Sequence, residues 1–137
     1  MKVYLCGPIN GCTDAQCIDW REEAKKEFPD AIDPMRRDYR GKEAAWVQDL
    51  VHQDKRDVAA CDVVLAYCPF PSVGTSMEVL LGWQLGKTVV AVVPDTERVS
   101  PWLCYHANVV ASLEDAFAFI RQVKLRSEKS RSPKQSD

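Results

Sequence analysis

Runs of consecutive apolar residues constrain the fold of this 137-residue chain more than any other feature. They cover residues 3–6, 63–67 and 88–93, and none of them alternates polar with apolar side chains. A strand that is apolar throughout is buried on both faces, which is typical of a parallel sheet covered by helices on its two sides. The runs therefore predict an α/β fold.

The segments between these runs repeat their apolar residues at helical spacing. We expect helices over 14–28, 43–60 and 75–85, a last helix that starts at Ser112, and two further short strands at 31–32 and 109–110. This alternation predicts a doubly wound, five-stranded parallel sheet of flavodoxin-like (Rossmann-like) order, with helices on both faces. Such sheets bind ligands at the carboxyl ends of their strands, which directs attention to the loops there.

The chain length fits one domain, which we place at residues 1–125. Residues 126–137 are rich in lysine, arginine and serine and carry no apolar anchor, so we expect a disordered tail there. The 18 basic and 20 acidic residues give a net charge of -2, which indicates neither a nucleic-acid nor a membrane partner. A small-molecule substrate fits this charge balance better.

The six cysteines form no C-x-x-C pair and no zinc-binding spacing, and the two histidines are isolated from each other. The apolar stretch at residues 3–6 is too short for a signal peptide or a membrane span. We therefore expect no bound metal, no cofactor and a reducing, cytoplasmic location.

Two loops at the carboxyl ends of strands could carry chemistry. The first, from Gly7 to Gly11, has a glycine-permitted backbone close to a helix N-terminus and could bind an oxyanion, or it is a plain tight turn; spacing favours neither interpretation. The second loop brings Ser72 to a helix N-terminus, with Glu78 in the first turn of that helix. A glutamate there is often only a favourable partner of the helix dipole. The apolar residues around Glu78 instead favour a functional site over a solvated surface.

Other polar residues leave two interpretations open. Asp54 lies in the C-terminal half of a predicted helix, where an acid opposes the helix dipole, or it belongs to a solvated face with Lys55. Tyr4 is a core residue whose hydroxyl could reach the end of its strand. Three arginines could clamp a phosphate or a carboxylate, or could pair with neighbouring acids: Arg36, Arg37 and Arg40.

Four segments, residues 4–11, 52–54, 61–64 and 71–79, together resemble the nucleoside 2-deoxyribosyltransferase family, including its branch of 2'-deoxynucleoside 5'-phosphate N-hydrolases. The resemblance extends in the same order over residues 1–119, and the Gly-x-x-x-Glu stretch that ends at Glu78 is its most specific part. It implies that Glu78 attacks the anomeric carbon and forms a covalent deoxyribosyl intermediate. Asp54 then protonates the leaving base or holds the nucleophile, and Tyr4 orients it.

The resemblance also implies a substrate site and a homodimer. Ser72 stands where nucleoside transferases carry an acid and monophosphate hydrolases carry a serine, which favours a nucleotide. Asn10 departs from the arginine of those hydrolases, a loss for which Arg36 or its neighbours could compensate. Ser100 matches a serine that the partner subunit contributes. The substrate-binding residues that we expect are Gly7, Ile9, Asn10, Gly11, Arg36, Ser72, Gly74, Ser76 and Ser100.

The sequence thus predicts an enzyme that cleaves the N-glycosidic bond of 2'-deoxyribonucleosides or their 5'-monophosphates, with water or a second base as acceptor. The alternatives are a nucleoside 2-deoxyribosyltransferase that acts on free nucleosides and a non-catalytic nucleotide-binding module, in which Glu78 is only a capping charge. A flavin protein of flavodoxin type fits less well, because the first loop lacks a hydroxyl-rich phosphate cradle.

Overall fold

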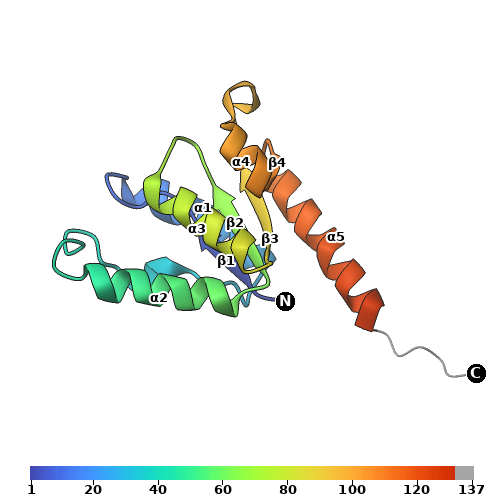
Figure 1. The fold of residues 1–137 in the computed structure, drawn as a ribbon, viewed down its shortest axis with the longest axis horizontal. Coiled ribbons are helices and arrows are strands. Elements are labelled where there is room, and N and C mark those ends of the chain that lie inside the picture. Colours follow the sequence, from blue (N-terminus) through green and yellow to red (C-terminus); the bar gives the residue numbers. More distant parts are fainter. Residues whose placement is uncertain (132–137) are drawn as a thin grey trace, which may run out of the picture.

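A computed structural model describes residues 1–131, and Figure 1 shows it as a ribbon. The strands are β1 (Val3–Cys6), β2 (Val63–Tyr67), β3 (Thr88–Val92) and β4 (Asn108–Val110). The α-helices are α1 (Asp14–Glu27), α2 (Val47–Ala60), α3 (Val73–Gln84), α4 (Pro101–His106) and α5 (Leu113–Arg131). Two short 3-10 helices, η1 (Pro34–Arg36) and η2 (Thr96–Arg98), complete the order.

The sheet is parallel throughout, in the order β1-β2-β3-β4. This confirms the predicted α/β fold, but the sheet has four strands and not five. The expected strand at 31–32 is a single bridge, in which Ile32 pairs with Tyr4 on the free edge of β1. It cannot grow longer because Asp33 caps η1 and Pro34, which follows, has no amide hydrogen to donate.

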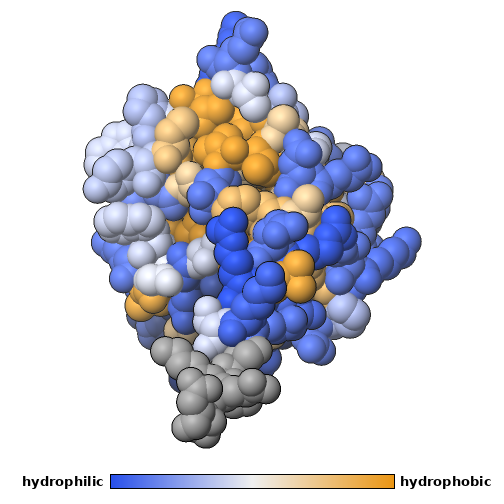
Figure 2. All heavy atoms as spheres, turned by 90° about the vertical axis from the view of Figure 1, so that its right-hand side faces the viewer, coloured by the Kyte–Doolittle hydropathy of each residue, from blue (hydrophilic) through white to orange (hydrophobic). Residues whose placement is uncertain are grey.

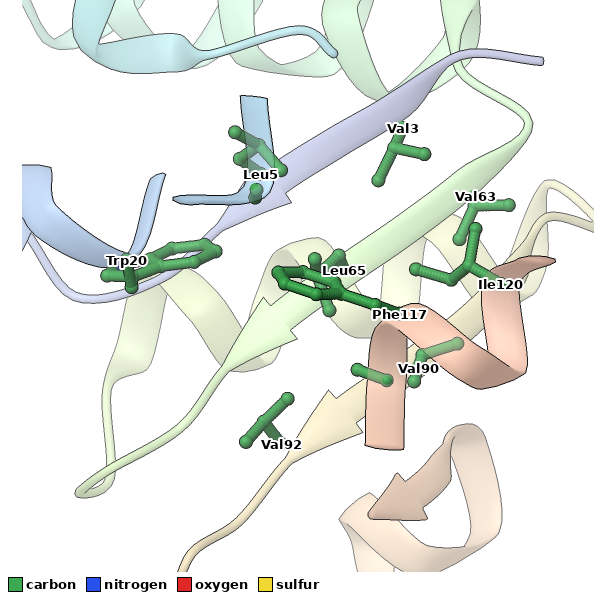
Figure 3. Packing of buried hydrophobic residues seen from close by; sticks show 11 residues of the cluster. Val3, Leu5, Trp20, Val63, Leu65, Val90, Val92, Phe117 and Ile120 are labelled. Carbon is green, nitrogen blue, oxygen red and sulfur yellow. The ribbon is translucent and has the colours of Figure 1, made fainter. Parts of the chain in front are cut away.

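Each face of the sheet has its own core, as expected for strands that are apolar throughout. Val3 and Leu5 of β1 point to one face, where α1 and α5 cover them. Figure 3 shows Phe117 and Ile120 of α5 against this face and Trp20 of α1 at the end of β1. The opposite face carries Tyr4, Cys6, Val58, Val64, Val79 and Ala91 and lies under α2 and α3. Tyr4 is therefore turned toward α2 and α3.

Side-chain caps start α1 and α5 at the predicted places. Thr13 accepts from the Gln16 amide, Gln16 returns a bond to the Thr13 amide, and this capping box opens α1. Ser72 caps α3 and Ser112 accepts from the Asp115 amide at the start of α5.

Three predicted boundaries are wrong. Helix α2 begins at Val47 and not at 43, because residues 40–45 form turns. Helix α3 begins at Val73, so Glu78 lies in its second turn and not in the first. Helix α5 continues to Arg131, so residues 126–131 are helical and not a disordered tail; residues 132–137 lie outside the described residues.

Within residues 1–131, no helix combines the length and the apolar character that crossing a membrane requires.

Candidate active site

Tyr4, Asp54 and Glu78 come together where β1, α2 and α3 meet. Tyr4 projects from β1 toward the face that α2 and α3 cover, and both helices pack on each other there. Asp54 is in the middle of α2 and Glu78 in the second turn of α3. The charges of both carboxylates act on the Tyr4 hydroxyl and, with its burial, raise its pKa far above the usual value. The structure thus gathers the three residues that the sequence predicts to be catalytic.

Glu78 carries an unusual carboxylate. Burial raises the pKa of its carboxyl to about 7, and the nearby Asp54 charge adds to this rise. The Tyr4 hydroxyl opposes the rise more than any other group, ahead of the Arg21 charge. Because Glu78 lies beyond the first turn of α3, the helix dipole does not account for a glutamate at this position. A carboxyl that titrates near neutrality can serve either as a nucleophile or as an acid.

Two oxygens of this cluster are left without a partner. Tyr4 Oη and Glu78 Oε2 are both buried, and neither has a hydrogen-bond partner among the residues that the structure describes. Such atoms are uncommon in folded proteins, because losing water without a replacement bond costs about 1–3 kcal/mol. Tyr4 is the second residue of β1, and Glu78 lies in α3, the helix that follows the carboxyl end of β2. They are therefore available to a substrate.

Asp54 is the second carboxyl that titrates near neutrality. Burial raises its pKa to about 6, while the charge of Arg37, whose Nη2 lies 3.8 Å from Asp54 Oδ1, opposes the rise. Two carboxyls that influence each other titrate as a pair, so the two values belong to Asp54 and Glu78 together. Between about pH 6 and 7 the pair holds a single proton.

The predicted arginine clamp is engaged with acids inside the protein. Arg36 Nη2 donates to Asp57 Oδ1 at 2.8 Å and Arg37 Nη2 to Asp57 Oδ2 at 2.5 Å. These two bonds outweigh burial and hold the pKa of Asp57 below its usual value. Arg40 forms ion pairs with Asp38 and Asp14. All three arginines thus pair with acids of the protein, and Arg36 donates to both Asp57 and the Asp33 carbonyl; its contact with substrate stays a prediction.

The loop between β1 and α1 carries four of the predicted substrate-binding residues. Ile9 accepts a hydrogen bond from the Cys12 amide, and Asn10 and Gly11 are exposed at the tip of this turn. Gly11 has a φ of 75°, which an L side chain rarely adopts. At Gly7, a Cβ atom would lie 2.7 Å from Trp20 Cζ2. Packing against α1, and not only ligand contact, therefore requires a glycine there.

The predicted serines face a different part of the molecule. Ser72, Ser76 and Ser100 line a groove of about 770 Å³ between α3 and α4, whose lining residues do not include Glu78 or Asp54. The two carboxyls whose pKa burial raises, Glu78 and Asp54, thus lie outside the lining of this groove. Gly74 lies in the first turn of α3 and is exposed. Ser76 Oγ donates to the Ser72 carbonyl at 2.8 Å.

The comparison with protein families identifies the chain. The sequence profile described as nucleoside 2-deoxyribosyltransferase matches residues 3–134. The chain belongs to the nucleoside 2-deoxyribosyltransferase family. This confirms the resemblance found in the sequence, and the protein is an enzyme, as the members of this family are. A search of the curated proteins gave no match.

Solved structures share the fold at low sequence identity. A conserved protein from Enterococcus faecalis superposes with a TM-score of 0.69 at 18% identity, covering 88% of this chain and 97% of the other. A 2-deoxyribosyltransferase from Bacillus psychrosaccharolyticus gives 0.68 at 16%, covering 85% and 90%. A CMP N-glycosidase from Clostridium botulinum gives 0.55 at 16%, covering 88% and 99%.

Some residues around the site of this family member were not found from the sequence. Asp57 acts on Asp54 through its charge, but an aspartate on a helix has the pattern of a surface residue; Arg37, which the sequence marked as a possible clamp, lies beside both acids. Cys6 lies fully buried on β1, with its Sγ 3.7 Å from the Thr75 carbonyl. Arg21 is buried beneath the β1–α1 loop, and only its position beside Trp20 in an apolar helix face hinted at that. Among the described residues, no three His, Cys, Asp or Glu side chains gather closely enough to hold a metal ion.

Proposed function

We propose that this protein cleaves the N-glycosidic bond of 2'-deoxyribonucleoside 5'-monophosphates through a covalent intermediate on Glu78. The observation that carries the proposal is the buried pair of carboxyls, Glu78 and Asp54, which titrates near neutrality beside the Tyr4 hydroxyl. Family membership supports activity on nucleosides as a transferase or an N-glycosidase. The nucleotide preference and the covalent step are our own extension.

The shared proton of the pair supplies both functional groups that the reaction needs. In the productive form Asp54 holds the proton and Glu78 is ionised; because the pKa of Glu78 is the higher of the two, this is the less populated of the two single-proton forms. A Glu78 oxygen bonds to the anomeric carbon as the bond from that carbon to the base nitrogen breaks, and Asp54 gives its proton to the departing base. Tyr4 Oη, which has no hydrogen-bond partner among the described residues and lowers the pKa of Glu78, would donate to the Glu78 carboxylate once it is ionised and hold it in line.

A second displacement releases the sugar. A water molecule attacks the anomeric carbon, its proton returns to Asp54, and Glu78 leaves as a carboxylate, so that the free deoxyribose 5-phosphate retains its configuration. A second base in place of water would give transfer. The alternative, a transferase of free nucleosides, uses the same residues and differs in the group that meets the 5' end of the sugar.

Ser72 supports the nucleotide over the free nucleoside. It caps α3 by accepting from the Thr75 amide at 3.5 Å, which leaves its hydroxyl hydrogen free to donate. The N-terminus of α3 also favours an anion, because its first amides point outward. The solved neighbour from Clostridium botulinum is a CMP N-glycosidase, and CMP is a nucleoside 5'-monophosphate.

An exposed apolar surface on α3 and α4 supports a homodimer. Met77 is 68% exposed, and Trp102 and Tyr105 are 75% and 71% exposed. On the side of the molecule that carries α5, Figure 2 shows a further group of apolar side chains in the upper part, with hydrophilic ones around them. Patches of this kind mark contact surfaces. If a second copy binds there, Trp102→Glu is expected to give monomers in analytical ultracentrifugation.

The state of the cysteines supports a reducing, cytoplasmic location. All six are free thiols: Cys6, Cys17 and Cys61 are buried, Cys12 and Cys68 are partly buried, and Cys104 is exposed.

The deciding experiment follows products by chromatography after incubation with deoxynucleoside monophosphates and with deoxynucleosides, with and without a second base. We expect free base and deoxyribose 5-phosphate from the wild type and a loss of at least about 1,000-fold in Glu78→Gln. Glu23→Gln, an exposed acid on α1, is the matched control. No base release from any substrate would favour the binding module, and a new nucleoside would favour transfer. A fluorinated analogue that labels a residue other than Glu78 would contradict the mechanism.

A further inference from the structure

Arg21 of α1 has a fully buried side chain beneath the β1–α1 loop, at 0% exposure. Its guanidinium donates to three main-chain carbonyls: Leu5 at 3.4 Å, Gly7 at 3.0 Å and Cys17 at 2.6 Å. Two of these belong to β1 and the residue that follows it, and the third belongs to α1. The arginine therefore ties the carboxyl end of β1 to the first helix.

The charge of Arg21 is only partly neutralised by the groups around it. Asp33 is the nearby carboxylate, and its Oδ1 lies 3.7 Å from Arg21 Nε, whereas Asp33 Oδ2 lies closer to Lys25 Nζ, at 2.9 Å. The Trp20 ring lies 4.6 Å from Arg21 Cζ. Figure 3 shows Trp20 at the end of β1, on the face opposite Tyr4. A buried charge is expensive, so a cation kept here with a shared counter-ion requires an explanation.

One part of the explanation is the loop. Gly7 precedes Pro8, which has no amide hydrogen, so the carbonyl of Gly7 is the only polar group of that peptide unit that can be hydrogen-bonded. Arg21 binds this carbonyl. The direction in which the chain leaves β1 toward Ile9 and Asn10 is thus fixed from inside the protein by Arg21.

The other part is the electric field at Glu78. The groups that act on Glu78 are Tyr4 and Cys6 from β1, Asp54 from α2 and Arg21 from α1. Arg21 is the cation of this set, and its charge lowers the pKa of both Glu78 and Asp54. Arg37 and Arg36 also act on Asp54. Arg21 therefore favours the ionised nucleophile.

We propose that Arg21 is a positioning residue of the active site, which fixes the start of the substrate loop through the Gly7 carbonyl and supplies a buried positive charge to the Glu78–Asp54 pair. Its catalytic consequence rests on the function proposed above. The placement of the charge does not, and it can be measured in a protein without activity.

The experiment measures the pKa of the Glu78 carboxyl by carbon-13 NMR titration, with Glu78→Gln to assign its resonance. Arg21→Met removes the charge and is expected to raise that pKa, by less than the ~1–3 units that a charge in direct contact causes. Arg21→Lys keeps the charge without the planar fork, so the pKa is expected to return toward the wild-type value. Lys26→Met, an exposed cation on α1, is the matched control and is expected to change nothing.

Asp33→Asn should shift the pKa of Glu78 in the opposite direction, and it leaves Arg21 in place. Asparagine keeps the oxygen that accepts from the Met35 amide at 2.8 Å, but it removes the negative charge beside Arg21. The pKa of Glu78 is then expected to fall. This variant and Arg21→Lys decide the question if Arg21→Met does not fold.

Kinetics separates the two roles of Arg21. In Arg21→Lys the loop loses the planar guanidinium that binds the Gly7 carbonyl. We therefore expect KM to rise about tenfold, while the pH optimum stays near that of the wild type. Shifts of the Glu78 pKa in the same direction in Arg21→Met and Asp33→Asn would overturn the proposal, as would an unchanged pKa in both. An inactive wild type with the expected pKa shifts would contradict the proposed function and leave the positioning role of Arg21 supported.

Discussion

Arg37 Nη2 lies 3.8 Å from Asp54 Oδ1 while it donates a 2.5 Å hydrogen bond to Asp57 Oδ2. Arg37 is thus hydrogen-bonded to Asp57 and interacts with Asp54 only electrostatically, at a longer distance. This arrangement leaves Asp54 without a direct ionic partner at hydrogen-bond distance, which is why burial can raise the pKa of its carboxyl to about 6 in spite of a nearby cation.

The pH dependence of base release should follow from this pair. Activity needs one proton on the two carboxyls, so kcat/KM is expected to be bell-shaped, with limbs near pH 6 and 7. Arg37→Gln removes a positive charge and raises the pKa of the pair, so the whole bell should move to higher pH. Initial rates over pH 4.5 to 9 (about one point per half unit) test this, and a bell that moves to lower pH in Arg37→Gln would contradict it. Arg98→Gln, an exposed arginine in η2, is the control.

The buried Glu78 carboxylate should reduce stability above neutral pH. Its pKa is near 7 in the folded protein against about 4.5 when unfolded, so the folded state binds more protons between these values and stability falls as the pH rises through them. Glu78→Gln removes this loss. We expect the variant to be about 1–3 kcal/mol more stable than the wild type at pH 8 and equally stable at pH 4. Urea unfolding at both pH values measures it, and a difference that does not depend on pH would disprove the explanation.

The fold could be predicted from the sequence because the strands of a parallel sheet are recognisable without any long-range information. The apolar runs that became β1, β2 and β3 are buried on both faces, as expected for this architecture. The strand expected at 31–32 shortened to one bridge because Pro34 begins another element immediately afterwards. Helix α4 was missed because it has only six residues, too few to show a helical period.

The site was predictable in part for the same reason. Glu78 follows from its place in the helix after the carboxyl end of β2, where parallel sheets bind ligands, whereas the role of Tyr4, the second residue of β1, followed from the family resemblance. The hydrogen-bond partners of Arg21 could not be predicted, because they are main-chain carbonyls at the end of β1 and just after it, which any residue type provides. A buried arginine in a helix has the same sequence pattern as one on a solvated face. Burial alone distinguishes the two.

Gly7 offers a test of how tightly the loop packs on α1. A Cβ at this position would lie 2.7 Å from Trp20 Cζ2, and the indole is itself held in the core and cannot move away freely. Gly7→Ala is therefore expected to destabilise the protein by about 1–3 kcal/mol. Gly74→Ala is the matched control, because nothing lies within 4 Å of its added Cβ and alanine suits a helix better than glycine. Thermal unfolding compares the two variants. Equal stability would mean that the Trp20 side chain moves aside to accommodate the added methyl group.

Ser72 gives the sharpest test of substrate class. Aspartate is as good a helix N-cap as serine, so Ser72→Asp should keep α3 intact while it adds a negative charge at the helix N-terminus. If the 5'-phosphate binds there, the like charges repel each other, and kcat/KM for deoxynucleoside monophosphates is expected to fall by about 100-fold or more. The value for the matching free nucleosides should stay within about threefold, because they carry no charge at this end.

Ser112→Asp makes the same change at the N-cap of α5, whose hydroxyl accepts from the Asp115 amide at 3.1 Å. It therefore controls for the added charge and for the capping substitution at once, and we expect it to leave the ratio of the two activities unchanged. A Ser72→Asp variant that loses both activities equally would indicate a damaged helix start. One that keeps full activity on monophosphates would place the phosphate elsewhere, because an anion at hydrogen-bond distance from residue 72 cannot ignore a new carboxylate in a partly buried position.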